Sequence, residues 1–388
     1  MGKKKIVWGT CWLREETELL CLFMKQAANA FAEMGMDVYT VVFDAAYKRD
    51  EKEIKKVKED IECIVIRNVC EIYPNKNYGV AIISKIAYKI GADYTAVVDS
   101  DWKIEDFNKF INNLLYPLLV EEQDLVIPDI STAAGRCNVL IGKPLLELFY
   151  QEYADKIPTA FPGAFLGKTR SIYEITSKST YHFDWGGEWD IIADSCKMGM
   201  KIASPVLGMQ NIRHRSNDSK TYDSFQIWRA CLEDLTESRL SHLNNVHECN
   251  IYEDPFAKVV LSAEMSATKQ IEKLIEWSKC NNISKTQLQL IYMVLLPLAA
   301  ILDDRCDYDT LIDIVTDAGQ PYERDELYKV ALLVPHCVRM AISYSGKSFE
   351  MIRKSAANCY GRHFSKWNVK GKEKAMGYAD AQILRMVL

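Results

Sequence analysis

The first 250 residues alternate short apolar runs with longer amphipathic stretches, and this alternation limits the fold more than any other feature. The apolar runs are rich in β-branched and aromatic residues, and they predict buried strands at residues 6–8, 38–43, 61–66, 94–98 and 125–127. Helical spacings between them, as at residues 15–34 and 80–90, end at Gly35 and Gly91. Strand, helix and strand in this order predict an α/β, Rossmann-like fold, with a mainly parallel sheet and helices on both faces.

The pattern changes after about residue 250. Helix-like stretches then follow one another with few strand candidates, at residues 256–277, 285–302, 308–316, 323–340 and 348–360. We therefore expect two domains, an α/β domain over residues 1–250 and a helical C-terminal extension over residues 251–388. The extension could cap a site or mediate a homodimer.

Composition excludes several classes of protein. The 388 residues carry 48 basic and 53 acidic side chains, a net charge of −5 with no basic stripe, so we expect no nucleic-acid partner. The 12 cysteines are dispersed without a Cys-x-x-Cys pair, which indicates reduced thiols. No signal-peptide core follows the basic start, and no apolar run approaches about 20 residues. These features predict a cytoplasmic protein with no membrane span.

The most informative segment is Asp99-Ser100-Asp101, directly after the strand expected at residues 94–98. Two carboxylates one residue apart then lie at the carboxyl end of a strand, where α/β sheets bind ligands. Carboxylate oxygens suit Mg²⁺ or Mn²⁺, and such an ion can neutralise the charge on a departing diphosphate. The alternative is that one of these residues only caps the helix expected at residues 104–115.

A second segment, residues 185–190, reads Trp-Gly-Gly-Glu-Trp-Asp and opens a helix expected over residues 191–198. Its glycine turn could present the Glu188 carboxylate to a hydroxyl group of an acceptor. The alternative is a solvated helix start, whose acidic residues complement the helix dipole.

Two further segments suggest anion binding. His214 lies between Arg213 and Arg215, so its imidazole could complete a metal site while the arginines hold a phosphate or carboxylate. Residues 131–138 follow a strand and include Gly135 and Arg136, a reasonable anion cradle. The alternatives are a surface histidine and an ordinary turn.

In this order and spacing, the segments resemble the retaining GT-A glycosyltransferases of the glucosyl-3-phosphoglycerate synthase and mannosylglycerate synthase group. The resemblance covers roughly residues 5–220. It rests on five segments: Asp99-Ser-Asp101, residues 135–146 from Gly-Arg-Cys-Asn to Pro-Leu-Leu, Phe161-Pro-Gly-Ala164, residues 185–194 from Trp-Gly-Gly-Glu to Asp, and His214-Arg215.

The resemblance implies a GT-A fold and a role for each matching residue. Asp101 would bind the metal directly, with His214 as the remaining protein ligand. Asp99 and Ser100 would lie on the ribose and diphosphate side of a nucleotide-sugar donor. Leu13 and Glu15, in a loop similar to the family's Leu-Asn-Glu-Glu, and Asp44 at the end of the second strand would contact the nucleoside.

The acceptor side is implied in the same way. Gly135, Arg136 and Asn138 match the positions that hold the acceptor's phosphate or carboxylate, and Glu188 would orient the acceptor's hydroxyl end without acting as a nucleophile. Arg215 and Ser216 lie on the acceptor side of the same motif. The chain departs from the family pattern at Asn138, where the family has Thr, and at Ser216, where it has Asn.

The donor loop differs as well. Residues 77–81 read Asn-Tyr-Gly-Val-Ala where the family has Gly-Lys-Gly-x-Ala, and Lys76 is close enough to replace the missing lysine.

The resemblance implies a metal-dependent, retaining transfer of a hexose from UDP-glucose or GDP-mannose to a small glyceryl acid, such as 3-phosphoglycerate or D-glycerate, in compatible-solute biosynthesis. Three alternatives stay open. A sugar-nucleotidyltransferase would need a glycine-rich signature near the first strand, which residues 9–14 lack. A two-carboxylate hydrolase leaves His214 unexplained. The third is a non-catalytic nucleotide- or sugar-binding protein.

Overall fold

The computed structural model describes the chain in two compact units. It describes residues 2–13, 15–46, 49–68, 76–102, 104–130, 135, 137–207, 217–236, 348–363 and 369–387, with isolated positions between 298 and 342. The first unit comprises Met1–Ala133, Lys156–Arg213 and Lys366–Leu388, and the second comprises Ala134–Asp155 and His214–Ser365. The domain boundary predicted at residue 250 falls outside the described residues and stays a prediction.

The described strands of the first unit form one mixed sheet in the order β3-β2-β1-β4-β6-β5-β7. They are β1 (Lys5–Trp12), β2 (Asp37–Asp44), β3 (Ile64–Arg67), β4 (Tyr94–Val98), β5 (Leu125–Val126), β6 (Ala164–Lys168) and β7 (Ile202–Ala203). Only β6 runs against its neighbours, pairing antiparallel with β4 and β5. The other pairings are parallel, so the carboxyl ends of β1 to β5 meet at one edge of the sheet.

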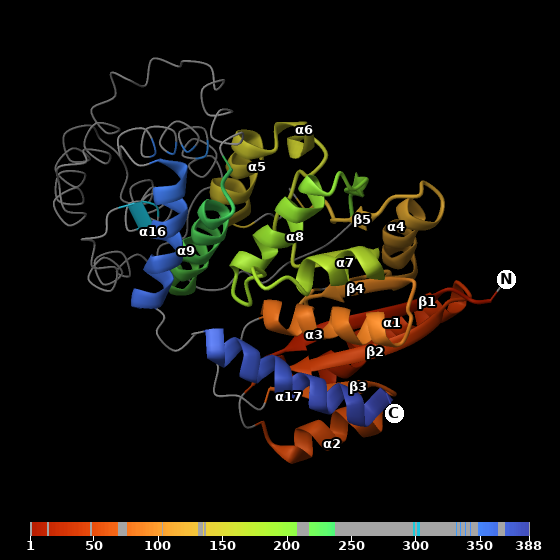
Figure 1. Cartoon of the computed structure of the whole chain (residues 1–388). Coiled ribbons are helices and arrows are strands. Elements are labelled where there is room, and N and C mark those ends of the chain that lie inside the picture. Colours follow the sequence, from red (N-terminus) through yellow and green to blue (C-terminus); the bar gives the residue numbers. More distant parts are fainter. Residues whose placement is uncertain are drawn as a thin grey trace. The chain divides into compact units, whose positions relative to one another are not determined.

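Helices cover both faces of this sheet (Figure 1). One face carries α1 (Thr17–Glu33), α2 (Glu51–Asp60) and α4 (Phe107–Leu119), and the other carries α3 (Lys76–Lys89) and α7 (Thr169–Thr176), with α8 (Gly186–Lys197) against α7. The chain adds β2 and β3 on one side of β1 and then crosses to place β4 on the other side. Because parallel crossovers are right-handed, this change of side puts α3 opposite α1 and α2. The predicted mainly parallel sheet with helices on both faces is confirmed.

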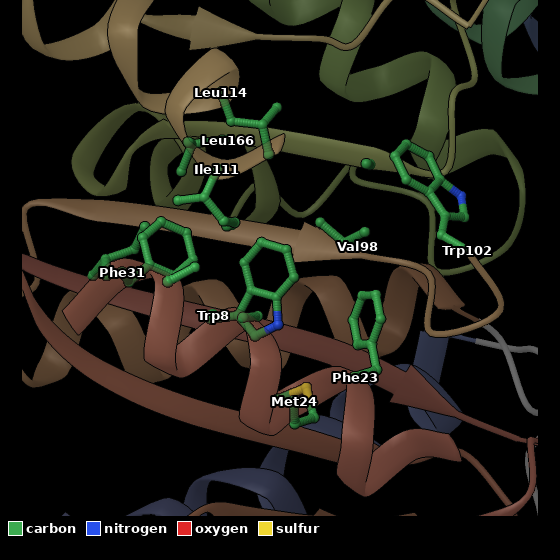
Figure 2. Packing of buried hydrophobic residues seen from close by; sticks show 14 of the residues in the cluster. Trp8, Phe23, Met24, Phe31, Val98, Trp102, Ile111, Leu114 and Leu166 are labelled. Carbon is green, nitrogen blue, oxygen red and sulfur yellow. The ribbon is translucent and has the colours of Figure 1, made fainter. Parts of the chain in front are cut away.

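The core lies between the sheet and the face covered by α1 and α4. Trp8 of β1 is fully buried there, with its ring 5.4 Å from that of Phe31 and 5.8 Å from that of Phe23. Figure 2 shows Trp8 facing these α1 rings, with Ile111 of α4 and Val98 of β4 beside them. On the other face, Gly9 leaves room for α3, because a Cβ there would lie 2.5 Å from Ile83. The layers therefore pack closely on both sides of β1.

The predicted strands and helices are found with shifted ends. Strand β1 continues to Trp12, beyond the predicted residue 8, and β3 begins at Ile64, after the predicted residue 61. The expected helix at residues 104–115 is α4 at Phe107–Leu119. Strand β6 was not predicted, because its sequence Ala-Phe-Leu-Gly-Lys is short and contains a glycine.

A C-terminal helix, α17 (Val369–Val387), belongs to the first unit and packs against α3 and the edge strand β3. The Gln382 side chain bonds both main-chain groups of Arg67, accepting from its N–H at 3.1 Å and donating to its carbonyl at 3.0 Å. Lys85 of α3 forms an ion pair with Asp380, and Ala379 and Ile383 are buried. The helix therefore covers an edge strand whose outer backbone groups would otherwise need solvent.

The described part of the second unit is helical. It contains a π-helical turn η2 (Asn138–Gly142), α5 (Lys143–Phe149), α6 (Gln151–Ala154), α9 (Asn217–Glu233) and α16 (Phe349–His363). Helix α16 lies beside α9, and Arg353 donates to the Glu233 carbonyl at 2.8 Å (Figure 1). Of the predicted helices after residue 250, the one at 348–360 corresponds to α16, and the other four lie outside the described residues apart from single positions.

Two further observations concern the cysteines and the predicted absence of a membrane span. The cysteines that the structure describes are free thiols. No helix in the described part of the chain has the length and apolar character that a membrane span requires.

Candidate functional site

Predicted site residues gather at the carboxyl edge of the sheet, in the first unit. Asp99, Ser100 and Asp101 follow the end of β4, Asp44 ends β2, and the turn after β1 carries Leu13 and Glu15. Strand β6 runs the other way, so its first residues join the same edge, where Val98 pairs with Ala164. This edge is where α/β sheets bind ligands.

The Asp99-Ser100-Asp101 turn is held by the sheet. The Asp99 N–H donates to the Gly163 carbonyl at 2.9 Å, directly before β6. The side chain that caps α4 is Asp106, which accepts from the Lys109 N–H at 3.0 Å. The interpretation of residues 99–101 as a mere cap for α4 is therefore wrong, and their polar groups need another explanation.

Lys76 joins two of the predicted carboxylates. At the start of α3, its Nζ lies 3.0 Å from Asp99 Oδ1 and 2.7 Å from Glu188 Oε1. The side chains of Lys76 and Glu188 are 13% and 8% exposed, and that of Asp99 is 30% exposed. Burial works to lower the pKa of Lys76, but Asp99 and Glu188 outweigh it and raise that pKa above its ordinary value. The lysine is therefore positively charged at neutral pH, and it lies between two carboxyl groups.

The turn before α8 delivers Glu188 to this cluster. Asn77, next to Lys76, donates from Nδ2 to the Asp184 carbonyl at 2.7 Å and thereby ties the turn to α3. Gly187 is required there, because a Cβ would lie 2.3 Å from the His182 carbonyl and 2.7 Å from Asn77. Glu188 is buried in the first turn of α8, so the interpretation of a solvated helix start is wrong.

The ends of β1 and β2 are tied together by Arg49. Its Nε donates to Asp44 Oδ1 at 2.7 Å, and its Nη2 donates to the carbonyls of Trp12 and Leu13 at 3.2 and 2.9 Å. The guanidinium lies over the Trp12 ring, 3.5 Å from its centroid. Glu15 closes the turn from the other side, because its Oε2 accepts from the Leu13 N–H at 2.9 Å. Leu13, Glu15 and Asp44 therefore form one rigid corner of the site.

The metal site is described only in part. His214 lies outside the described residues, and among those described no group of three or more histidine, cysteine, aspartate or glutamate side chains could hold a metal ion. Asp101 offers the hard oxygen ligands that Mg²⁺ and Mn²⁺ take, at the strand end where a ligand is expected. The residue present therefore fits such an ion, with further ligands needed from elsewhere.

Apart from Glu188, the predicted acceptor residues lie outside the described residues or in the second unit. Arg136, Arg215 and Ser216 lie outside the described residues. Gly135 and Asn138 belong to the second unit, where the Gly135 carbonyl accepts from the Asn138 N–H at 3.0 Å and the Asn138 side chain is buried at the start of η2. Their role in acceptor binding stays a prediction.

Sequence reasoning missed Arg49, Asn77 and Asp190 as parts of this edge. Asp190 accepts from the His182 N–H at 2.6 Å and pairs with its ring Nδ1 at 2.9 Å, which fixes the turn before Glu188. No motif marks Arg49, which follows a lysine and precedes an ordinary helix cap, Asp50. Asn77 directly follows Lys76, and the family pattern has glycine at its position. That difference was the sequence signal that could have identified Asn77.

No family model matches the chain, and no curated protein matches it significantly. Solved structures of glucosyl-3-phosphoglycerate synthase from Mycobacterium tuberculosis are similar to it. One, in complex with Mn²⁺, uridine diphosphate and glucosyl-3-phosphoglycerate, is 21% identical with a TM-score of 0.46, and covers 61% of this chain and 80% of its own. Another, with Mn²⁺, UDP-glucose and phosphoglyceric acid, is 20% identical with a TM-score of 0.46, and covers 61% and 79%. Both belong to the group of GT-A glycosyltransferases that the sequence motifs resemble.

Proposed function

We propose that this chain is a metal-dependent glycosyltransferase that moves a hexose from a nucleotide sugar to a small glyceryl acid. The observation that supports this most is the cluster of Lys76, Asp99 and Glu188. Asp99 and Glu188 come from two separate motifs that the resemblance assigns to donor and acceptor binding. Lys76 directly precedes the donor loop, more than 100 positions before Glu188. A structural ion pair alone would not require two motif carboxylates to meet at a ligand-binding edge.

The donor would lie along the carboxyl ends of β1, β2 and β4. Leu13, Glu15 and Asp44 would meet the nucleoside, while Asp99, Ser100 and Lys76 would meet the ribose, the diphosphate and the sugar. The buried Ser100 hydroxyl has no hydrogen-bond partner among the described residues, so a ligand oxygen there would satisfy it. Lys76 can exchange a carboxylate partner for an oxygen of the donor without losing its charge.

A Mg²⁺ or Mn²⁺ ion, held by Asp101 and His214, would stabilise the charge that develops on the departing diphosphate. Around it, the chain's own residues would position the reactants. Glu188 would orient the acceptor hydroxyl at the anomeric carbon, and Gly135, Arg136 and Asn138, with Arg215 and Ser216, would bind its acid group. Positioning and electrostatic stabilisation are the main contributions of such a site. The configuration at the anomeric carbon would be retained, as in the group that the motifs resemble.

A panel of donors and acceptors tests the proposal. UDP-glucose and GDP-mannose are each incubated with D-glycerate and 3-phosphoglycerate, with Mn²⁺ or Mg²⁺, and the products are identified by mass spectrometry and NMR. We expect at least one pairing to give an α-linked product, and a chelator to abolish the transfer. Comparing the two acceptors also decides whether the acceptor is phosphorylated.

A matched pair of variants locates the metal function. Asp101→Asn should lower transfer by about 100-fold or more, because removing one group that stabilises developing charge commonly has an effect of this size. Asp106→Asn, five residues further on, keeps the cap of α4 and should leave transfer unchanged. Near wild-type turnover in Asp101→Asn would sink the metal assignment, and donor binding without transfer in every pairing would favour the non-catalytic alternative.

A further inference from the structure

Arg49 has an unusual number of contacts for a residue that no motif marks. Its side chain is 8% exposed and that of Asp44 is 1% exposed, so the ion pair between them is shielded from solvent. Beyond Asp44 and the two carbonyls after β1, its Nη1 lies 3.7 Å from Glu53 Oε2. A guanidinium can make these contacts in one plane while it stacks on Trp12, whereas an ammonium cannot.

The groups that Arg49 holds belong to the turn that follows β1 and to the last residue of β2. The Leu13 peptide is fixed at both ends, because its N–H donates to Glu15 and its carbonyl accepts from Arg49. The Trp12 indole N–H donates to the Glu15 carbonyl at 2.9 Å and closes the same turn. Arg49 therefore holds Asp44 and Leu13 directly, and Glu15 is held through its hydrogen bonds to Leu13 and Trp12.

A second observation, at the Asp44 carboxylate, also points to a bound ligand. Its Oδ1 accepts from Arg49 and from the Ala46 N–H at 3.2 Å, but its buried Oδ2 has no hydrogen-bond partner among the described residues. Burial raises the pKa of this carboxyl, and Arg49 opposes the rise. An unpartnered buried acceptor is unfavourable until a donor meets it, and nucleobases carry N–H groups that can do so.

We propose that Arg49 is a positioning residue that presets the Leu13 turn and the Asp44 carboxylate for the nucleoside end of the donor. The inference rests on the proposed function and deepens it, since it names the residue that holds the nucleoside-binding groups in place. Arg49 acts through Asp44 and the backbone, and it does not touch the diphosphate.

The test separates the two ends of the donor. Dissociation constants are measured by calorimetry, with Mn²⁺ present, for UDP, for GDP and for inorganic pyrophosphate, which carries the diphosphate without the nucleoside. Arg49→Lys keeps the charge but loses the planar fork, and Arg49→Met loses both. We expect each variant to weaken binding of the preferred nucleotide by about tenfold or more, the effect of losing one hydrogen bond to a charged group, while pyrophosphate binds within about twofold of wild type.

Lys4→Met is the matched control. Lys4 forms an ion pair with Asp93 at 2.9 Å, at the opposite, amino end of the sheet, and should affect neither ligand. In transfer assays, Arg49→Lys should raise the KM for the donor and leave kcat within about twofold. Partial unfolding would instead lower the apparent kcat, because less active enzyme would be present. Melting curves check that each variant is folded. If Arg49→Met does not fold, the binding data for Arg49→Lys decide the test.

Two results would overturn the inference while the proposed function stands: nucleotide binding as tight as wild type in Arg49→Lys, or equal weakening of nucleotide and pyrophosphate. If the wild-type protein binds neither UDP nor GDP, the proposed function fails, and the inference fails with it.

Discussion

Lys76 stands between Asp99 and Glu188, and its charge keeps two carboxylates together at one buried position. Without it, the two carboxylates would face each other with no cation between them, and like charges repel in a poorly solvated site. The residue therefore has an electrostatic role before any substrate binds. Its own charge persists across the physiological range, because its pKa is raised above 10.5.

This role gives a prediction with a pH signature. In the wild type, the stability contributed by Lys76 is fully present below pH 10.5 and lost only as pH rises through its higher folded pKa. Lys76→Met should be destabilised by about 3 kcal/mol at pH 8, as when one partner of a buried ion pair is removed. Because Lys76 keeps its charge at pH 5 as well, its contribution to wild-type stability is present at both pH values.

Thermal and urea unfolding at pH 5 and pH 8 would measure the effect. Lys168→Met is the control: Lys168 pairs with Asp124 but is 43% exposed and lies away from the cluster. Its loss should change stability by under about 1 kcal/mol at either pH. Equal effects of the two substitutions would argue against a special role for Lys76.

At the scale of the elements, β6 matters because it returns antiparallel beside β4 and brings Gly163 against Asp99. Gly163 has a φ of +81°, a conformation that disfavours residues with a Cβ, and a Cβ there would lie 2.4 Å from Asp99 Oδ2. The position thus combines a backbone requirement with a steric one. Both follow from the way β6 enters the sheet.

Gly163→Ala should therefore lose stability and displace Asp99, whereas a matched glycine should show only the first effect. Gly35 ends α1 with a φ of +75°, and nothing lies within 4 Å of the Cβ position. Each substitution should lower the free energy of unfolding by about 1–2 kcal/mol through the left-handed backbone. Only Gly163→Ala should also lower the rate of sugar transfer from the donor, measured at saturating acceptor. Full turnover in Gly163→Ala would show that Asp99 tolerates displacement.

At the scale of the whole molecule, the first unit is assembled from three separated segments of the chain. The last of them contains α17, which packs on α3 and β3, so the end of the chain belongs to the α/β unit. Because α3 begins with Lys76, the helix that α17 supports is also the helix that carries the central cation. The C-terminal residues are thus part of the architecture that surrounds the site.

The packing of α17 can be tested at two adjacent residues. Ile383 is 1% exposed, and Leu384 is 48% exposed. Ile383→Ala should lower the free energy of unfolding by about 2–4 kcal/mol, as expected for a buried aliphatic side chain. Leu384→Ala should change it by less than about 0.5 kcal/mol. Urea unfolding measures both, and equal values would mean that α17 is not packed on the unit.

Much of the sheet was predictable from sequence, for a local reason. Strands β1, β2 and β4 are runs of β-branched and aromatic residues that are buried on both faces, so their hydrophobicity is continuous and visible. Helix α1 shows the spacing of an amphipathic helix and ends before Gly35. Strand β6 and helix α17 were missed, because a short strand with a glycine and a polar helix owe their positions to distant partners.

The sequence by itself determined most of the strands and helices of the sheet, the acidic turn at residues 99–101 and the glycine turn before Glu188, because these depend on neighbouring residues. Only the tertiary structure decided that Lys76 lies between Asp99 and Glu188, and that Arg49 joins the ends of β1 and β2. Those contacts join residues far apart in sequence, or residues that no motif marks. They exist because parallel strands bring their carboxyl ends to a single edge.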